Sequence, residues 1–547
     1  MRYGKLALVL MLIISLLGAG CGRDKAGQPE SPASPAKLQP GGQLIYGSLM
    51  EPNTLNPLLS DLLATAEVGS LIFSGLVQVN EKGEWVADLA SEVPTVQNGG
   101  VSRDGLTVTY RLRPGVTWHD GTPFTSADVK FTWEFIMNRR ANVVSRDGYD
   151  KISAVDTPDA NTVVVRFRQY YPPFMTLFTT ILPKHALSGA EDVNKAAFNR
   201  APVGTGPFKL KEWRIAEAVV LEANQSYFKG RPNLDSIVYR VIPDSNIMLT
   251  QLKAGEVDIV SNVGLAQLEQ VKAVSGVRAV VTANMIWEHL DFNLDNALFQ
   301  DARVRRAITL ALDRQAIITA NLKGVASPAV GDQSPLSWAY NPVLKAPARD
   351  LAAARDLLAQ AGFAPGPDGV FAKGGRRLAF TLETTAGNKT REAVAQAIAQ
   401  QLKEAGIEMT VRLVDAPVFF GDVLKARRFE AAMFAWVAGL DPDNISLWHS
   451  RNIPAAGNGY QGQNYAGWRN PEVDAQTELG ARLVDVEARK QAYFRIQELI
   501  VQEAPVIPLY FRSNVDAVRD TVVNYKPNPT QAGNLWNARE WGLTKKR

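Results

Sequence analysis

Side chains suited to metal or acid–base chemistry are few and dispersed in this chain of 547 residues. The four histidines, His119, His185, His289 and His449, have no paired spacing, which favours structural or surface roles over metal ligation. No HExxH, GxSxG or Walker A motif occurs, and the lone GxG at Gly204 lacks the third glycine of a nucleotide cradle. The carboxylates number 55 and allow a chance catalytic pair, but no motif indicates an enzyme, a metal site or a cofactor.

The only cysteine, Cys21, lies close to the N-terminus and cannot form an internal disulfide or a Cys-rich metal site. It follows a short positive region, an apolar run at 6–17 and three small residues. That run is shorter than the roughly 18 apolar residues of a membrane-spanning helix. The pattern resembles a bacterial lipoprotein signal, in which the cysteine is acylated, although Gly18 stands where an aliphatic residue is usual. An ordinary cleaved signal with a chance cysteine is the alternative.

We therefore predict a signal peptide at 1–20 and a lipid anchor with a flexible tether at 21–40, where Pro, Ser, Ala and Gly are frequent. Taking 20 residues from 547 leaves 527, and the net charge falls from +4 to +2 because Arg2 and Lys5 are lost. The mature protein is expected at the membrane surface outside the cytoplasm, either in a periplasm or at the cell surface. Its nearly neutral net charge gives no indication that it binds nucleic acid.

The predicted helices and strands, which must position any functional site, follow one another along the chain in no strict order. Since a single core rarely grows beyond roughly 250–300 residues, more than one domain is expected. Apolar residues are 46% of the chain and charged residues 21%, which is ordinary globular composition. Mixed elements predict an α/β fold with mixed α+β lobes. Strands are expected at 44–46, 76–79, 108–113, 162–167, 287–293, 378–383, 408–414 and 429–437, and helices at 126–136, 300–319, 350–361, 388–405 and 471–503.

Residues 105–135 carry the most specific motif, a strand, an Asp-Gly turn and a capped helix. This block resembles the signature of the solute-binding protein family 5 of bacterial ABC importers, the peptide- and nickel-type binding proteins. Further blocks at 41–60, 202–213, 241–260, 290–314, 436–444 and 464–474 resemble the family in the same order along the chain. The matching signature positions are Arg113, Gly115, Val116, Trp118, His119, Asp120, Gly121, Pro123, Phe124, Thr125, Asp128 and Val129.

The resemblance implies a periplasmic-binding-protein-like clamp of two lobes with an extra domain, in which the chain crosses between lobes. Lobe I is then expected at 41–72 with 202–284 and 512–547. The extra domain is expected at 73–201 and lobe III at 285–511. A ligand would lie between the lobes and be buried by their closure.

Peptide-binding members of the family place an acid three residues after a cleft-facing Trp, where it pairs with the peptide ammonium group. The corresponding Trp is Trp436, but Gly439 stands at the acid's position. Either Asp441 replaces that acid through a shift of the loop, or this chain has no acid that pairs with the peptide ammonium group. We favour the second alternative. Dipeptide binders also place an Arg before the helix that starts near Asn388, whereas here only Arg391 is nearby. Both departures weaken a dipeptide assignment and leave longer peptides or a different solute.

The other ligand-binding candidates also follow from the resemblance. Thr65 and Ala66 stand where lobe I of the family touches ligand, Tyr465 lies in the second-lobe ligand region, and Arg512 could face an anionic ligand. Aromatic residues in cleft-facing blocks, each of which could instead be core or surface, are Trp287, Trp436, Trp448, Tyr465, Trp468 and Tyr510.

The expected function is therefore that of a monomeric, lipid-anchored solute receptor that captures an oligopeptide and delivers it to ABC permease subunits, without nucleic-acid partners. A nickel chelate or an opine is the alternative ligand. A secreted hydrolase or a sensory module is a further alternative.

Overall fold

The computed structural model describes residues 39–530 and 533–545. The chain divides into two units, 1–37 and 38–547. Cys21, the predicted signal peptide and nearly all of the predicted tether lie outside the described residues. None of the helices in the described ranges is both long enough and apolar enough to cross a membrane.

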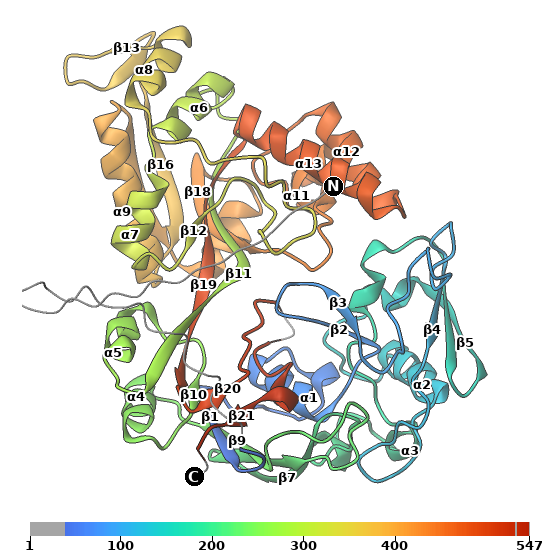
Figure 1. Ribbon diagram of the computed structural model, residues 1–547. Helices are drawn as coiled ribbons and strands as arrows, with labels where there is room; N and C mark the ends of the chain where they lie inside the picture. Colours follow the sequence, from blue (N-terminus) through green and yellow to red (C-terminus); the bar gives the residue numbers. More distant parts are fainter. Residues whose placement is uncertain (1–38, 531–532, 546–547) are drawn as a thin grey trace, which may run out of the picture. The chain divides into compact units, whose positions relative to one another are not determined.

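A mixed sheet of eleven strands runs through residues 39–545 (Figure 1). The strand order across the sheet is β17-β16-β18-β11-β19-β10-β1-β9-β8-β7. Strand β12 pairs with β19 outside this order. The strands are β1 (Gln43–Ser48), β7 (Phe208–Arg214), β8 (Ala218–Ala223), β9 (Ser236–Val241), β10 (Ile259–Val260), β11 (Val277–Phe292), β12 (Ser327–Pro328), β16 (Ala379–Thr385), β17 (Glu408–Val414), β18 (Ala431–Val437) and β19 (Val506–Arg519).

Two long antiparallel strands, β11 and β19, hold the two ends of this sheet together (Figure 1). The first part of β11 pairs with the last part of β19, which also pairs with β10. The second part of β11 pairs with both β19 and β18. The chain therefore crosses from one half of the sheet to the other through these two strands, as the resemblance implied.

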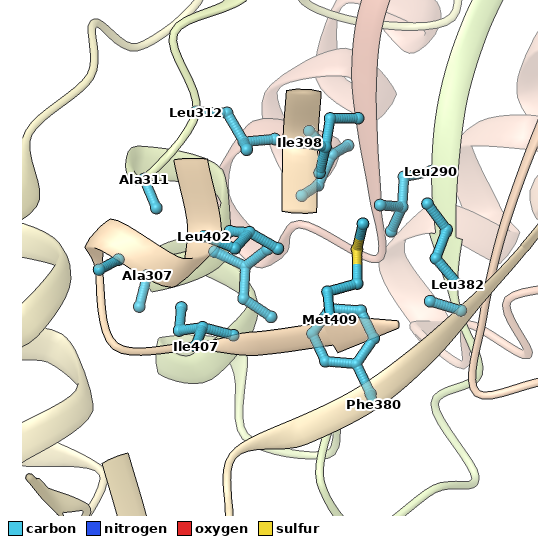
Figure 2. Close-up of a cluster of buried hydrophobic side chains, with 14 of the residues drawn as sticks. Leu290, Ala307, Ala311, Leu312, Phe380, Leu382, Ile398, Leu402, Ile407 and Met409 are labelled. Carbon is cyan, nitrogen blue, oxygen red and sulfur yellow. The ribbon is translucent and has the colours of Figure 1, made fainter. Parts of the chain in front are cut away.

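The largest core packs helices against the half of the sheet that contains β16, β17 and β18. Buried side chains from α6, α9, β16 and β17 point toward one another there, as Figure 2 shows for Ala307, Leu402, Phe380 and Met409. Burial of such apolar side chains contributes roughly 1.5–3 kcal/mol each. The helices of this half are α6 (Ala302–Leu310), α7 (Arg314–Leu322), α8 (Leu351–Gln360), α9 (Lys389–Glu404), α11 (Ile445–Trp448), α12 (Pro471–Arg482) and α13 (Val486–Glu503).

Two of the predicted helices are each a pair of helices. The segment 300–319 is broken between α6 and α7, and the segment 471–503 is broken between α12 and α13. In each case an aspartate begins a new helix, because Asp313 accepts from the Ala316 N–H at 2.8 Å and Asp485 from the Ala488 N–H at 2.8 Å.

Residues between 76 and 181 form a separate core around a three-stranded sheet, β4 (Thr107–Arg111), β6 (Thr162–Phe167) and β5 (Ile152–Asp159). The signature block folds here as predicted, with α2 (Ser126–Met137) beginning after Thr125. Asp128 accepts from the Thr125 N–H at 2.9 Å and so caps that helix. A hairpin of β2 (Val77–Val79) and β3 (Trp85–Ala87) borders this core.

Candidate functional site

A cavity of about 720 Å³, here named the central cavity, is the main candidate site. Its volume lies within the roughly 300–1,000 Å³ of small-molecule sites. The walls come from four places: α1 (Leu63–Ile72) and the loops beside it, the β2–β3 hairpin with 176–180, the middle of β11 with 437–440, and the C-terminal residues 514, 529, 530 and 536.

A bulge in β11 supplies one wall of the central cavity. Pairing with β19 is interrupted between Ala283 and Trp287, so Asn284, Met285 and Ile286 leave the ladder with β19 and line the cavity, while Ile286 still pairs with Val437 of β18. The Asn284 amide holds this shape, because its Nδ2 donates to Asn514 Oδ1 at 3.0 Å and its Oδ1 accepts from the Ile286 N–H at 2.9 Å.

Helix α1 forms another wall, and only one of its two predicted ligand residues lines the cavity. Ala66 is exposed and lines the cavity. Thr65 is fully buried and donates its hydroxyl to the Thr54 carbonyl at 3.0 Å. The C-terminal end of α1 is fixed by the turn at Gly204, where an added Cβ would lie 1.8 Å from the Ile72 carbonyl oxygen. This segment is therefore a site of close backbone approach.

The central cavity is nearly free of charge. Among the described residues that line it, Asp88 is the only one with an ionisable side chain. Asp88 is buried and pairs with Lys229 at 2.6 Å, so its charge is neutralised. The polar lining consists of uncharged groups that can both donate and accept hydrogen bonds, and it comprises Ser70, Ser74, Gln78, Thr176, Thr179, Thr180, Asn284, Asn514 and Thr530.

A second cavity of about 220 Å³, here named the side chamber, adjoins the first. The two cavities share the wall formed by residues 437–439. Trp436 lines the side chamber, and its ring stacks on Tyr465 at a centroid distance of 5.9 Å and an interplanar angle of 8°. This stacking contact with Tyr465 stabilises the orientation of the Trp436 ring.

Asp441 lines the side chamber, but its carboxylate is already paired. Arg489 donates to its two oxygens at 3.0 and 2.6 Å, and this arginine is only 3% exposed. The bidentate pair raises the pKa of Arg489 far above its ordinary value, against the effect of burial. Asp441 consequently carries no free charge for a ligand ammonium group in this conformation.

Arg512 and Arg391 share another buried carboxylate, that of Glu288. Arg391 donates to Glu288 at 3.0 Å and to Thr385 at 2.6 Å. Arg512 donates to the same glutamate at 2.9 Å through Nε. None of these four residues lines the central cavity or the side chamber.

The structure thus brings Ala66 and Gly439 to the central cavity and Trp436, Gly439 and Asp441 to the side chamber. Sequence reasoning missed Asp332, which lies in the side chamber, because no local motif distinguishes it from other loop aspartates.

Comparison with known proteins identifies the family of this chain. Residues 84–456 match the model of the bacterial extracellular solute-binding proteins, family 5, in its middle region. The chain belongs to this family. Membership confirms the resemblance deduced from the signature block, and it makes the chain a solute-binding protein of the type that serves ABC importers.

Relatives of the chain match it over nearly its whole length. The oligopeptide-binding protein AppA of Bacillus subtilis is 30% identical over 559 residues, with all of both chains covered. The glutathione-binding protein GsiB of Salmonella typhi is 27% identical, with 85% of this chain and 88% of the relative covered.

Solved structures confirm the two-lobed α/β fold class. AppA of Bacillus subtilis in complex with a nonapeptide matches with a TM-score of 0.66 at 31% identity, and 93% of this chain and all of that chain are covered. CtaP of Listeria monocytogenes matches with 0.78 at 26% identity and coverage of 93% and 100%. NikZ of Campylobacter jejuni in complex with Ni(L-His) matches with 0.69 at 27% identity and coverage of 92% and 100%.

Proposed function

We propose that this protein captures oligopeptides in the central cavity and delivers them to the permease of an ABC importer. The observation that carries this proposal is the charge-neutral lining of the cavity, which is rich in small hydrogen-bonding side chains. A peptide backbone offers one uncharged donor and one uncharged acceptor per residue, and both need partners once they are buried. The nonapeptide bound by AppA, a relative of similar length, supports the same ligand class.

Strand β2 supports a way of holding such a backbone. It lines the central cavity and pairs with β3 on one side. Its other edge pairs with no further strand in the part of the chain that the structure describes, and on that edge the Val79 carbonyl accepts from Asn528 Nδ2 at 2.9 Å. An extended peptide can add to such an edge through main-chain hydrogen bonds, which are independent of sequence.

The two charge clamps of dipeptide recognition are unavailable in this chain, which favours longer peptides. Asp441 is paired with Arg489, and Arg391 shares the carboxylate of Glu288 with Arg512. Affinity then depends on the length of backbone bound rather than on the distance between two charged ends.

We assign lobe I to 41–72, 202–284 and 512–547, the extra domain to 73–201 and lobe III to 285–511. Two of these boundaries, 284/285 and 511/512, lie within β11 and β19, the strands that cross from one half of the sheet to the other. Closure about these strands would bury the peptide and favour ligands that contact both lobes. The same proposal includes a monomeric protein held outside the cytoplasm by acylation of Cys21.

We further infer that the protein does not cleave its ligand. The single carboxylate among the described residues lining the central cavity, Asp88, is bound to Lys229, so no acid–base pair of carboxylates faces the ligand there. A peptide recovered after prolonged incubation should have its original mass.

A nickel chelate is a second candidate ligand, supported by the similarity to NikZ with bound Ni(L-His). Among the described residues, no group of three or more His, Cys, Asp or Glu side chains could hold a metal ion. The metal would therefore enter as a chelate bound largely through its organic part. Calorimetry with free nickel, with nickel–histidine and with peptides separates the two candidates.

Trp436→Ala tests whether the side chamber takes part in peptide binding, with Trp213→Ala as a control because that tryptophan lines neither cavity. A ligand at 100 times its Kd stabilises the folded state by about 2.7 kcal/mol, which thermal unfolding detects. We expect weaker peptide binding in Trp436→Ala and unchanged binding in the control. Equal affinity in both variants would remove Trp436 from the binding site.

A further inference from the structure

The lining of the central cavity offers no counter-ion to an anionic group. No lysine, arginine or histidine is among the described residues that line it, and its one carboxylate, Asp88, is buried and paired with Lys229 at 2.6 Å. The Lys229 ammonium group is held a second time, because it also donates to the Ala87 carbonyl at 3.3 Å. A carboxylate that entered this cavity would therefore lose its water without gaining a cation, which is costly.

Three hydroxyl groups of the lining have already donated their only hydrogen. Ser70 and Thr176 each donate to a nearby backbone carbonyl at 2.7 Å, and Thr530 donates to the Asn528 amide oxygen at 2.6 Å. Toward a ligand these three oxygens can only accept, so they suit an N–H group and offer nothing to a carboxylate. The lining also contains donors such as the Gln78 amide, but these are neutral and do not compensate a buried negative charge.

The adjoining side chamber contributes negative charge rather than positive. Three aspartates line it, Asp332, Asp441 and Asp443, and its described lining residues include no lysine, arginine or histidine. Asp441 is paired with Arg489. Neither Asp332 nor Asp443 forms an ion pair with any of the described side chains. Carboxylates without a counter-ion repel an anion nearby, so the side chamber does not offer an alternative place for one.

We propose that the central cavity selects oligopeptides whose carboxyl end is uncharged, as in a terminal amide or a closed ring, against oligopeptides with a free terminal carboxylate. This inference rests on the proposed function, because it specifies which peptides the cavity takes. A terminal amide has the size of a carboxylate but no charge, and it supplies two N–H donors of the kind that the hydroxyl oxygens of Ser70, Thr176 and Thr530 accept. The same exclusion applies to aspartate and glutamate side chains of the ligand.

Isothermal calorimetry on the full chain at pH 7 tests the proposal with one pentapeptide in two forms. All side chains are uncharged and the amino terminus is acetylated, so the forms differ only in a carboxyl end that is either an amide or a free acid, which is ionised at this pH. We expect the free acid to bind at least tenfold more weakly, because its charge is buried without a partner. Equal affinities, or tighter binding of the free acid, would overturn the proposal.

Gln78→Lys provides a reversal of the expected preference. Gln78 is a half-buried residue of β2 in the cavity lining, so a lysine there supplies the missing cation. We expect this variant to bind the free acid at least tenfold more tightly than the wild type does and the amide no more tightly. Gln315→Lys, at an exposed position of α7 outside both cavities, is the matched control and should keep the wild-type preference. An unchanged preference in Gln78→Lys would show that charge does not set it and would overturn the proposal.

Two small probes separate this proposal from the proposed function. Trp85 and Trp536 line the central cavity, so its occupation should change the tryptophan fluorescence. N-Acetylvalinamide should produce the change at concentrations at least tenfold lower than N-acetylvaline. If the probes behave in this way and no oligopeptide binds, selection by charge stands and peptide capture fails. If oligopeptides bind equally well as amide and free acid, selection by charge fails alone, and if neither probes nor oligopeptides bind, both proposals fail.

Discussion

Glu67 provides a pH-dependent test of how helix α1, which forms a cavity wall, is held in place. This carboxyl group is 3% exposed and accepts from Tyr46 Oη at 2.9 Å and from Tyr239 Oη at 2.8 Å. Desolvation raises its pKa from 4.5 to about 7, although both tyrosine hydrogen bonds act to lower it. When protonated, Glu67 can donate to Tyr239 Oη while that hydroxyl donates to Ser48 Oγ at 2.7 Å.

The sign and size of the effect follow from this pKa. The folded state binds the Glu67 proton more tightly than the unfolded state, so its contribution to stability is fully present below pH 4.5 and is lost as pH rises through about 7. Each pKa unit corresponds to about 1.36 kcal/mol, so the stability lost through Glu67 over that window is about 3 kcal/mol. Nearby Asp516, whose pKa burial raises to about 6, titrates in the same direction.

Glu67→Gln isolates this contribution, because the neutral amide can donate to Tyr239 at every pH and Asp516 is present in both proteins. We expect denaturant unfolding at pH 8 to show the variant about 3 kcal/mol more stable than the wild type, and at pH 4.5 to show almost no difference. Glu191→Gln, at an exposed position, should give no such trend. A difference between Glu67→Gln and wild type that is constant from pH 4.5 to 8 would refute the reasoning.

Three further substitutions test the packing described above. Leu402→Ala, in the core shown in Figure 2, should lower the free energy of unfolding by about 2–5 kcal/mol in chemical denaturation, and a loss below ~1 kcal/mol would contradict its placement. Gly204→Ala should be strongly destabilising because its Cβ would meet the Ile72 carbonyl oxygen at 1.8 Å, so wild-type stability would show that the turn is not packed there. Arg489→Met should cost about 3 kcal/mol by leaving Asp441 unpaired, and Asp441→Asn in the same chain should restore part of that loss.

The sequence predicts a helix or strand well where the residues that determine it are close neighbours in the chain. Helix α2 begins at Ser126, as predicted, because the Asp128 carboxylate accepts a hydrogen bond from the Thr125 N–H three residues away. The breaks between α6 and α7 and between α12 and α13 are missed because both members of each pair continue an apolar pattern toward a buried core. The capping residues Asp313 and Asp485 are the local signals that could have revealed these breaks.

Long-range pairing explains what the sequence could not predict. Strand β11 begins at Val277 rather than near 287, because its first part is stabilised by β19, which lies more than two hundred residues away. The cavity walls depend on the same pairing, since Asn284 reaches its place through Asn514. Asp332 stands in a loop without periodicity, and its hydrogen bonds with Trp448 and Asn444 arise only in the folded chain.

The most direct test of the central claim is calorimetric titration of oligopeptides into the wild type and into Ala66→Trp. Ala66 is exposed on the cavity wall, so a tryptophan there would project into the central cavity and obstruct it without disturbing the core. We predict micromolar or tighter binding to the wild type, about −8 kcal/mol or better, and loss of binding in a variant whose stability is unchanged. Failure of peptides of every length tested to bind the wild type, or equal affinity for both proteins, would contradict peptide capture in this cavity.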